Sequence, residues 1–584
     1  MRGMERAWAF GVLMLGLGGA GCGGTNEPTS AEGSATGEAT TGSDRGSSGA
    51  AVTSRGTGSD SGPEPSSGTT GLDDEASSET GAEADPGEWQ LPESHRVGPI
   101  LDMYPLYPRP DAEVPSSAYH RVAHPQLQYR VPIGVQGGEW PFQYALLSGP
   151  EGASFVASEL TRRLDPPTGM LVHERTPGYG VLEWTPTAGT HTFEVRVTDQ
   201  SGDSADFSWE VVTDESAFVF VDAADGDDDA TGSFEDPLRT FAGGLWGNDD
   251  GDESFAGRVA VFREGEYEIF AAEPNTSPVL DWERKPSAFV GFPGESTVFD
   301  VSEGHFRSGG RGSHDDLFVS GIDFVGSRSD LGNNRIFNIT ARSSRMTFWE
   351  LSFDQSSVGT IGTDNPGCIA LMSDGLWHEN LFVSDSTLGS EGGMQLVVTF
   401  DTNFALFERN TADRVDLAGS NGSMFLRAKD DTSNVTIRDN RFVGSVIDRA
   451  ISVSNQNTVD SPPENQEVCW NTVVLDGGDA GISVNQSSSS PDGVNTHVYR
   501  NSVVSERRAI RFNGAVDPVP TLLQGNAYFG EEDGVFGSNF VPGDVRDVEL
   551  GRDDFSNDAA LVGEARATHG GVRGAEVMAP ADGG

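Results

Sequence analysis

The chain has 584 residues, 90 of them acidic and 38 basic, and its formal net charge at pH 7 is −52. Such an excess of negative charge argues against nucleic acid and anionic membrane surfaces as partners, because both would repel it. With 75 glycines and few long apolar runs, the composition predicts β structure and turns rather than helices.

The first residues have the pattern of a targeting segment. Arg2 and Arg6 precede the apolar run "AWAFGVLMLGLGGAG", which is too short to anchor the chain across a bilayer. Cys22 follows directly, so residues 1–22 resemble a bacterial lipoprotein signal peptide, and this resemblance implies lipidation of Cys22. Ordinary secretion is the alternative. Both interpretations predict an exported protein, which lipidation would place at the outer membrane or cell surface with a lipid anchor as its only membrane contact.

A polar segment follows the signal. Residues 23–88 are rich in Ser, Thr, Gly and Glu, and Val52 and Leu72 are their only large apolar residues. This composition cannot bury a core and predicts a disordered tether, whose r.m.s. reach as a flexible coil is about 45 Å. Residues 89–116 are rich in proline and form a lead-in to the first folded domain.

Residues 117–213 have the alternation of half-buried strands. Phe193, Val195 and Val197 alternate with polar residues, and a second strand of the same kind follows the turn "DQSGD". The segment resembles the cadherin-like Ig modules of bacterial surface proteins, with the pattern "Y-x-L-x-x-G-P-x-G", "L-x-W-x-P" and "V-x-V-x-D". The matching residues are Tyr144, Leu146, Gly149, Pro150, Gly152, Leu182, Trp184, Pro186, Val195, Val197 and Asp199. The resemblance implies an Ig-like β-sandwich that serves as a spacer or an adhesive unit.

The clearest pattern is a repeat of about 30 residues in the second half of the chain. Six asparagines recur in similar frames: Asn380, Asn410, Asn440, Asn471, Asn501 and Asn526. A second, apolar series consists of Ile336, Ile369, Leu396, Leu426, Ile451, Ile482 and Ile510. Two short strands per repeat, separated by turn residues, predict the coils of a β-solenoid. Equivalent asparagines in stacked coils can hydrogen-bond to one another as a structural ladder.

The lead-in "FVFVDAADGDDDATGSFEDPLRTF" and the segment "GRVAVFREGEYEI" resemble the entry to the pectate-lyase-like superfamily. The implied fold class is all-β: a right-handed parallel β-helix over residues 217–530, preceded by the Ig-like β-sandwich and followed by a C-terminal cap and tail over 531–584. The handedness comes from the resemblance, whereas the solenoid follows from the repeat itself.

Alignment of the coils places a group of cations on one face. With Leu426, Ile451, Ile482 and Ile510 pointing inward, five basic residues point outward: Arg427, Lys429, Arg449, Arg508 and Arg511. Arginine forks suit carboxylates and sulfates, so this face could bind an acidic polysaccharide or cell-surface glycan. A solvated face with scattered arginines is the alternative.

Lys429 raises a second possibility. Its stretch, "FLRAKDDTSNVTIRDNRF", resembles the coil of alginate lyases and chondroitinase B that carries a lysine base. The matching residues are Lys429, Asn434, Ile437, Arg438, Asn440 and Phe442. In that branch an arginine on the next coil neutralises the substrate carboxylate, but Ser454 takes its place here, and Arg449 lies about 16 Å away along the strand. We therefore expect glycan binding or adhesion without turnover, with a lyase acting by β-elimination as the alternative.

Two further groups of side chains are candidates for a metal site and for a disulfide. Asp225, Asp227 and Asp229 could bind calcium through their oxygens, although solvation of an acidic loop explains them as well, and no other cofactor is indicated. Cys368 and Cys469 lie about three coils, or about 14 Å, apart, which is beyond disulfide reach. We expect both to be buried free thiols.

Overall fold

The computed structural model describes residues 101–549 with internal gaps, all within one compact unit that spans residues 82–584. The gaps are 111–113, 157–161, 165–170, 174–179, 242–244, 246–254, 270–285, 303–305, 309–313, 327–334, 340–341, 355–366, 372–377, 390–394, 418–423, 431, 447–448, 456–464, 476–477, 487–495, 514–520, 538–539 and 543–547. The expected signal peptide with Cys22, the tether and the tail beyond residue 549 lie outside the described residues. Within the described part, no helix is long and apolar enough to cross a membrane.

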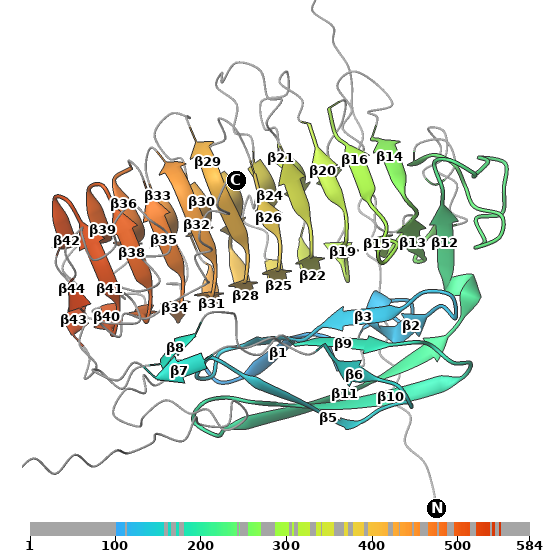
Figure 1. Ribbon diagram of the computed structural model, residues 1–584, viewed down its shortest axis with the longest axis horizontal. Coiled ribbons are helices and arrows are strands. Elements are labelled where there is room, and N and C mark those ends of the chain that lie inside the picture. The colour runs from blue at the N-terminus through green and yellow to red at the C-terminus, as the bar shows by residue number, and fades with distance from the viewer. Residues whose placement is uncertain are drawn as a thin grey trace, which may run out of the picture. The chain divides into compact units, whose positions relative to one another are not determined.

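The N-terminal module is a sandwich of short sheets (Figure 1). One sheet has the order β2 (Val122–Ala123), β11 (Ser204–Thr213), β10 (Thr190–Thr198) and β5 (Gln143–Ser148). The sheet facing it consists of β3 (Tyr129–Pro132), β9 (Val181–Trp184) and β6 (Ser154–Phe155). Two further pairs are β1 (Tyr104–Tyr107) with β4 (Gly134–Gln136), and β7 (Arg162–Leu164) with β8 (Leu171–His173), and the short 3-10 helices are η2 (Tyr119–Arg121) and η3 (Glu215–Ala217).

Aromatic side chains fill the space between the two main sheets of the sandwich. Phe193 and Trp209 stack with ring centroids 5.4 Å apart, and the Trp209 indole donates a hydrogen bond of 2.9 Å to the Tyr129 hydroxyl. Buried apolar residues alternate with exposed polar residues along β10 and β11, as the sequence pattern predicts. Strand β1 falls within residues 89–116, so part of the expected lead-in contributes a strand of its own.

The rest of the chain is a parallel solenoid with three sheets. The thirteen-stranded sheet contains β12 (Phe218–Val221), β13 (Val259–Phe262), β15 (Ala288–Gly291), β18 (His314–Asp315), β19 (Phe318–Ser320), β22 (Ser343–Trp349), β25 (His378–Ser384), β28 (Thr402–Glu408), β31 (Ser433–Arg438), β34 (Gln466–Cys469), β37 (Thr496–Tyr499), β40 (Thr521–Gln524) and β43 (Phe540–Pro542). The eleven-stranded sheet contains β14 (Gly265–Glu268), β16 (Thr297–Asp300), β20 (Asp323–Val325), β23 (Ser352–Asp354), β26 (Thr387–Leu388), β29 (Thr411–Leu417), β32 (Arg441–Val446), β35 (Thr472–Leu475), β38 (Ser502–Ser505), β41 (Ala527–Gly530) and β44 (Val548–Glu549). The nine-stranded sheet contains β17 (Phe306–Ser308), β21 (Arg335–Ile339), β24 (Gly367–Leu371), β27 (Gln395–Phe400), β30 (Met424–Lys429), β33 (Arg449–Asn455), β36 (Ala480–Gln486), β39 (Arg508–Asn513) and β42 (Asp533–Gly537).

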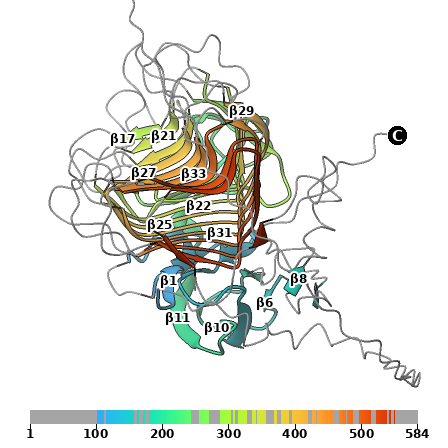
Figure 2. The same ribbon diagram turned by 90° about the vertical axis from the view of Figure 1, so that its left-hand side faces the viewer.

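Each strand of these sheets pairs in parallel with its equivalent in the next coil, and Figure 2 shows the three sheets as three sides of the coil. An all-β chain with a parallel β-helix is therefore confirmed. The inward column of the nine-stranded sheet differs in detail from the expected series, because Phe337 and Val397 stand in register where Ile336 and Leu396 were expected. In both strands the expected residue is followed directly by another apolar residue, so the sequence alone leaves a one-residue ambiguity.

A ladder of asparagine side chains follows the corner between the thirteen- and eleven-stranded sheets. The Nδ2 atoms of Asn410, Asn440, Asn471 and Asn501 each donate to the Oδ1 of the next asparagine at 2.9–3.0 Å, and Asn526 accepts the last bond. Each accepting Oδ1 also receives the backbone N–H of the preceding asparagine. The ladder thereby satisfies buried polar groups at a corner where the strands have ended.

Asn380 does not belong to this ladder. It lies within β25 with a φ of 56°, and its Oδ1 accepts a hydrogen bond of 3.3 Å from the Tyr104 hydroxyl. Ser386 takes the ladder position, where its backbone N–H donates to Asn410 Oδ1 at 3.2 Å. The reason is a shorter coil: His378 pairs with Thr402, only 24 residues later, so an interval of 30 residues from Asn410 misses the corner.

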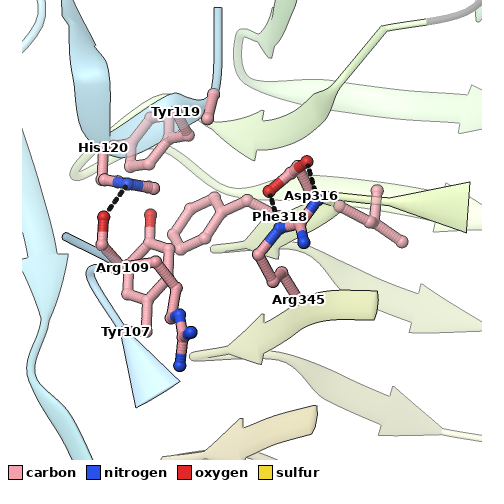
Figure 3. Close-up of a pocket in the computed structure, with 9 residues that line it drawn as sticks. Tyr107, Arg109, Tyr119, His120, Asp316, Phe318 and Arg345 are labelled. Carbon is pink, nitrogen blue, oxygen red and sulfur yellow. Dashed lines mark hydrogen bonds and ion pairs between the residues drawn. The ribbon is translucent and has the colours of Figure 1, made fainter. Parts of the chain in front are cut away.

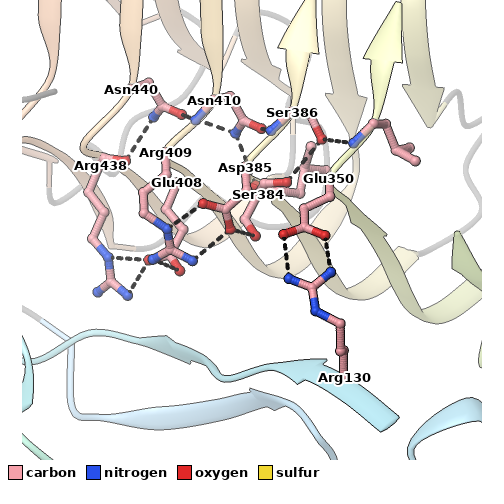
Figure 4. A network of polar contacts seen from close by, with 12 residues as sticks. Arg130, Glu350, Ser384, Asp385, Ser386, Glu408, Arg409, Asn410, Arg438 and Asn440 are labelled. Carbon is pink, nitrogen blue, oxygen red and sulfur yellow. Dashed lines mark hydrogen bonds and ion pairs between the residues drawn. The ribbon is translucent and has the colours of Figure 1, made fainter. Parts of the chain in front are cut away.

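The sandwich packs against the outer face of the thirteen-stranded sheet. Arg438 of β31 donates a hydrogen bond of 2.6 Å to the carbonyl oxygen of Val135 in β4. It also donates one of 2.7 Å to Glu408 Oε2 (Figure 4). The side chains of Arg438 and Glu408 are 1% and 0% exposed. The guanidinium carbon also lies 4.5 Å and 4.6 Å from the ring centroids of Trp140 and Phe142. A buried, paired arginine thus joins the two parts.

Other contacts extend this junction. Arg130 of β3 forms an ion pair of 2.7 Å with Glu350 of the solenoid, and the ring of Tyr119 stacks 4.2 Å from that of Phe318. Tyr104 of β1 stacks on Phe404 at 4.4 Å. Where these residues lie, the sandwich occupies the outer face of the thirteen-stranded sheet, which therefore cannot bind a ligand there.

Replacing Asn440 with leucine should lower the free energy of unfolding by about 1–3 kcal/mol, because the polar groups of its neighbours would stay buried without partners. Urea unfolding followed by circular dichroism measures the loss. Asn513→Leu, on the outer face of β39, is the matched control, and we expect it to change the free energy by less than about 0.5 kcal/mol. Equal losses in the two variants would contradict the role of the ladder.

Arg438→Met should destabilise the protein more strongly, by about 3–5 kcal/mol, because it leaves the Glu408 carboxylate buried with one cation fewer. The same urea experiment measures this change. The control is Arg196→Met, which removes an exposed arginine that pairs with Asp206 on the sandwich and should have little effect. A mild effect of Arg438→Met, similar to that of the control, would show that the stability of the fold does not depend on this buried ion pair.

Candidate functional site

The outer face of the nine-stranded sheet carries the five cations that the alignment singles out. Arg427 pairs in register with Ser452, which pairs with Ser483 and then with Arg511. Parallel strands lie about 4.8 Å apart, so Arg427 and Arg511 are about 14 Å apart along the coil axis.

Two further outward columns run beside the first. One consists of Lys429, Ser454, Asn485 and Asn513, and the other of Met424, Arg449, Ala480 and Arg508.

The cations form two groups at the ends of this face. Arg427, Lys429 and Arg449 lie on β30 and β33, and Arg508 and Arg511 lie on β39. All five are half-buried, whereas the small polar residues between the two groups are buried: Ser452, Ser454, Ser483 and Asn485. A ligand bound on this face would therefore contact the two cation groups rather than the buried polar residues between them.

Lys429 is held by its own neighbours. Its Nζ lies 3.3 Å from Asp430 Oδ2 and 4.7 Å from the ring centroid of Phe400, the residue opposite on the preceding coil. The side chain is 15% exposed. On the next coil the residue in register is Ser454, as the alignment indicated. In the alginate-lyase and chondroitinase-B branch that the sequence resembles, the neutralising arginine stands at this position. Here the position carries the hydroxyl of Ser454.

The C-terminal group is organised around a carboxylate that sequence reasoning missed. Asp479, in the turn before β36, forms ion pairs with Arg508 Nη1 at 2.5 Å, with Arg511 Nη1, and with Arg507 Nη1 at 3.5 Å. The guanidinium of Arg508 also lies 4.3 Å from the ring centroid of Phe536, which is 39% exposed. Extending the aligned columns by one coil would have found Phe536, since it pairs in register with Arg511.

The acidic loop proposed for calcium is organised as turns. The side chains of Asp225, Asp227 and Asp229 are exposed. Asp227 Oδ1 accepts the backbone N–H of Asp229 at 3.1 Å, and Asp222 Oδ1 accepts that of Asp225 at 3.1 Å. Among the described residues, no three His, Cys, Asp or Glu side chains come close enough to hold a metal ion. The Asp227 carboxylate thus caps a turn of this loop, and calcium binding by these residues stays a prediction.

The two described cysteines lie outside the strands that carry the five cations. Cys368 and Cys469 are free and buried, and burial raises the pKa of both thiols well above the usual range. Both pack as small apolar groups.

A small cavity lies where the sandwich meets the solenoid (Figure 3). His120 and Tyr107 line it from the N-terminal side, and Asp316 and Arg345 line it from the thirteen-stranded sheet, joined by an ion pair of 2.6 Å. The buried hydroxyl of Tyr107 has no hydrogen-bond partner within the described structure. The cavity has room for about one water molecule, so it belongs to the packing of the junction rather than to a substrate site.

His120 of this cavity should make the stability acid-sensitive. Burial, followed by the positive charge of Arg121, lowers the pKa of His120 to about 3, whereas an unfolded histidine has a pKa of about 6.5. The unfolded chain then binds a proton that the folded protein excludes. The contribution of His120 is therefore complete above about pH 6.5 and falls by up to about 1.4 kcal/mol per pH unit as the pH drops towards 3.

A His120→Gln variant should flatten this dependence. The free energy of unfolding of both proteins would be measured between about pH 7 and pH 4 and compared as slopes, so that any constant destabilisation by the substitution cancels. An identical slope in the two proteins would contradict the assignment to His120.

Comparisons with known proteins complete the description. No protein-family model matches the chain, and no curated protein sequence matches it. Among solved structures, a rhamnogalacturonan lyase matches 57% of this chain and 86% of its own, with 11% identity and a TM-score of 0.30. A family 28 exopolygalacturonase of Yersinia enterocolitica matches 63% of this chain and 85% of its own, with 11% identity and a TM-score of 0.26. The parallel register of the strands defines the solenoid independently of these similarities.

Proposed function

We propose that this chain is an exported, lipid-anchored surface protein whose β-helix binds an acidic polysaccharide or cell-surface glycan without turning it over. The observation that carries the proposal is that five half-buried cations lie in two groups on one outer face of a protein with a net charge of −52. Because the strands pair in parallel register, equivalent residues recur about every 4.8 Å along the coil axis. Such a face matches a chain-like ligand that carries acidic groups at intervals.

Arginine dominates this face, with Lys429 as the only lysine among the five cations. The planar guanidinium forms two parallel hydrogen bonds with a carboxylate or sulfate, which makes arginine better suited than lysine to recognising such groups. The partial burial of the five side chains strengthens charge-assisted bonds relative to fully exposed ones. The ligand class that this chemistry favours is a uronate-containing or sulfated glycan.

Binding without turnover is favoured over β-elimination by the surroundings of Lys429. A lyase of this kind needs a second cation on the next coil to neutralise the substrate carboxylate, and Ser454 stands at that position. Lys429 forms an ion pair with Asp430, so it can pair with an acidic group of a ligand in the same way.

The remaining parts of the proposal come from the sequence. Lipidation at Cys22 would anchor the chain, and residues 23–88 would form a tether between the anchor and the folded part. We propose that residues 117–213 are a cadherin-like Ig spacer in front of the β-helix, which was expected to end at residue 530 but whose parallel strands continue to Glu549. The hydrogen bond from Arg438 to the Val135 carbonyl, with the rings of Trp140 and Phe142 against its guanidinium, supports a spacer that holds the β-helix in a constant orientation, because leaving a buried charge with fewer partners is costly.

The test uses residues 23–584 incubated with alginate, pectate and glycosaminoglycans, with and without calcium. We expect salt-sensitive binding to at least one of these glycans, since ion pairs at a surface are screened by salt. Arg427→Ala and Lys429→Ala should each weaken binding by roughly tenfold, the loss of about 1.4 kcal/mol expected for one charge-assisted hydrogen bond. Arg196→Ala, on the sandwich, is the matched control and should bind as the wild type does.

Ultraviolet absorbance of unsaturated uronate ends is followed in the same samples. No absorbance should develop. Product formation that Lys429→Ala abolishes would replace the proposal with the polysaccharide lyase. Absence of binding to every glycan in the panel would refute the proposed function.

A further inference from the structure

We propose that Asp479 occupies the anion position of the C-terminal cation group, and that an acidic group of the ligand binds there by displacing it. In this arrangement Asp479 is an internal competitor that sets the affinity of the site. The identity of the ligand as a glycan rests on the proposed function above, whereas the existence of the anion position rests on the contacts around Asp479.

The first observation is convergence. The carboxylate of Asp479 forms ion pairs with Arg508 and Arg511 and a longer one, 3.5 Å, with Arg507 Nη1. Several guanidinium groups thus share one carboxylate. Arg508 and Arg511 come from the same strand, β39, and Asp479 comes from the turn that precedes the neighbouring strand, β36. Arginines that meet around one carboxylate have the arrangement that bidentate recognition of a carboxylate or sulfate needs.

The second observation is the degree of burial. The side chains of Asp479, Arg508 and Arg511 are only 15–20% exposed, whereas Arg507 and Glu532 at the edge of the group are 45% and 46% exposed. Electrostatic attraction is stronger in a partly desolvated position than in open water. Arg507 and Glu532 thus form the more exposed edge of the group, and Asp479, Arg508 and Arg511 form its less exposed part.

The third observation concerns which partner can leave. Asp479 lies in a turn, directly after Gly478 with its φ of 85°, and it belongs to no strand. Rotation of its side chain would vacate the position and leave the parallel ladder intact. The other acidic partners of Arg508, Glu532 and Asp533, lie farther away at 3.3 Å and 3.8 Å.

The fourth observation is an apolar surface beside the position. Phe536 is one of three large apolar side chains that are exposed in the described part of the chain. Its ring lies 4.3 Å from the guanidinium carbon of Arg508. A flat ring next to an arginine pair offers apolar contact to the face of a sugar while its acidic group replaces Asp479. A free inorganic anion would use the arginines alone.

An internal carboxylate competes at a high effective concentration, because it is attached next to its partners. Replacing Asp479 with the isosteric, neutral asparagine should therefore lower the Kd for an acidic ligand by roughly tenfold. Asp206→Asn is the matched control, because Asp206 likewise pairs with an arginine, Arg196, but on the sandwich. That variant should behave as the wild type does.

The experiment titrates residues 23–584 with sodium galacturonate and, separately, with sodium sulfate at constant ionic strength. The rise in Tm with ligand concentration reports binding to the folded state, and the glycan panel is repeated with each variant. We expect Asp479→Asn to gain galacturonate affinity and Asp479→Asn/Arg511→Ala to lose that gain. Sulfate should bind more weakly than galacturonate, because it makes no contact with Phe536.

The outcomes separate the two proposals. Tighter galacturonate binding by Asp479→Asn, with no glycan bound by any variant, supports the anion position and refutes the glycan-binding function. Glycan binding that depends on Arg508 but is not improved by Asp479→Asn overturns the role of Asp479. If Asp479→Asn fails to fold, the Nε nuclear magnetic resonance signals of Arg508 and Arg511 are followed in the wild type. Absence of any shift up to the solubility limit of galacturonate would overturn the inference.

Discussion

The in-register pairing of parallel strands is the constraint on which the rest of this structure depends. Each coil places its residues about 4.8 Å above the equivalent residues of the coil before it, so equivalent side chains form a column along the axis. The inward column around Leu426 and Ile451 fills the core, and the corner column of Asn410 and Asn440 joins buried amides. The same rule makes an outward arginine part of a surface rather than an isolated charge.

A second constraint decides which surface remains open. Arg438 is buried together with Glu408, and burial of an ion pair has a large desolvation cost that only good geometry offsets. Here the offset comes from two hydrogen bonds to Glu408, a third to the Val135 carbonyl, and the rings of Trp140 and Phe142. The sandwich thereby covers the thirteen-stranded sheet where these residues lie, and a ligand must use another side.

The cation face shows how acidic composition and anion recognition coexist. Neighbouring carboxylates neutralise much of its charge: Asp430 pairs with Lys429, and Asp479 pairs with Arg508 and Arg511. Charges of this kind are held in place before a ligand arrives, which lowers the cost of ordering them. The same carboxylates reduce the attraction of the face for anions, so affinity depends on how readily they give way.

The sequence by itself determined the solenoid, because apolar and asparagine positions recur with the period of a coil, and it placed Arg427, Lys429 and Arg511 in their outward columns. It misplaced Asn380, because one coil is shorter than its neighbours and an interval of 30 residues no longer reaches the corner. Only the tertiary structure decided that Val135 meets Arg438 and that Asp479 lies among three arginines. Such contacts depend on turn geometry and on the packing of the sandwich against the solenoid, and neither leaves a periodic pattern in the chain.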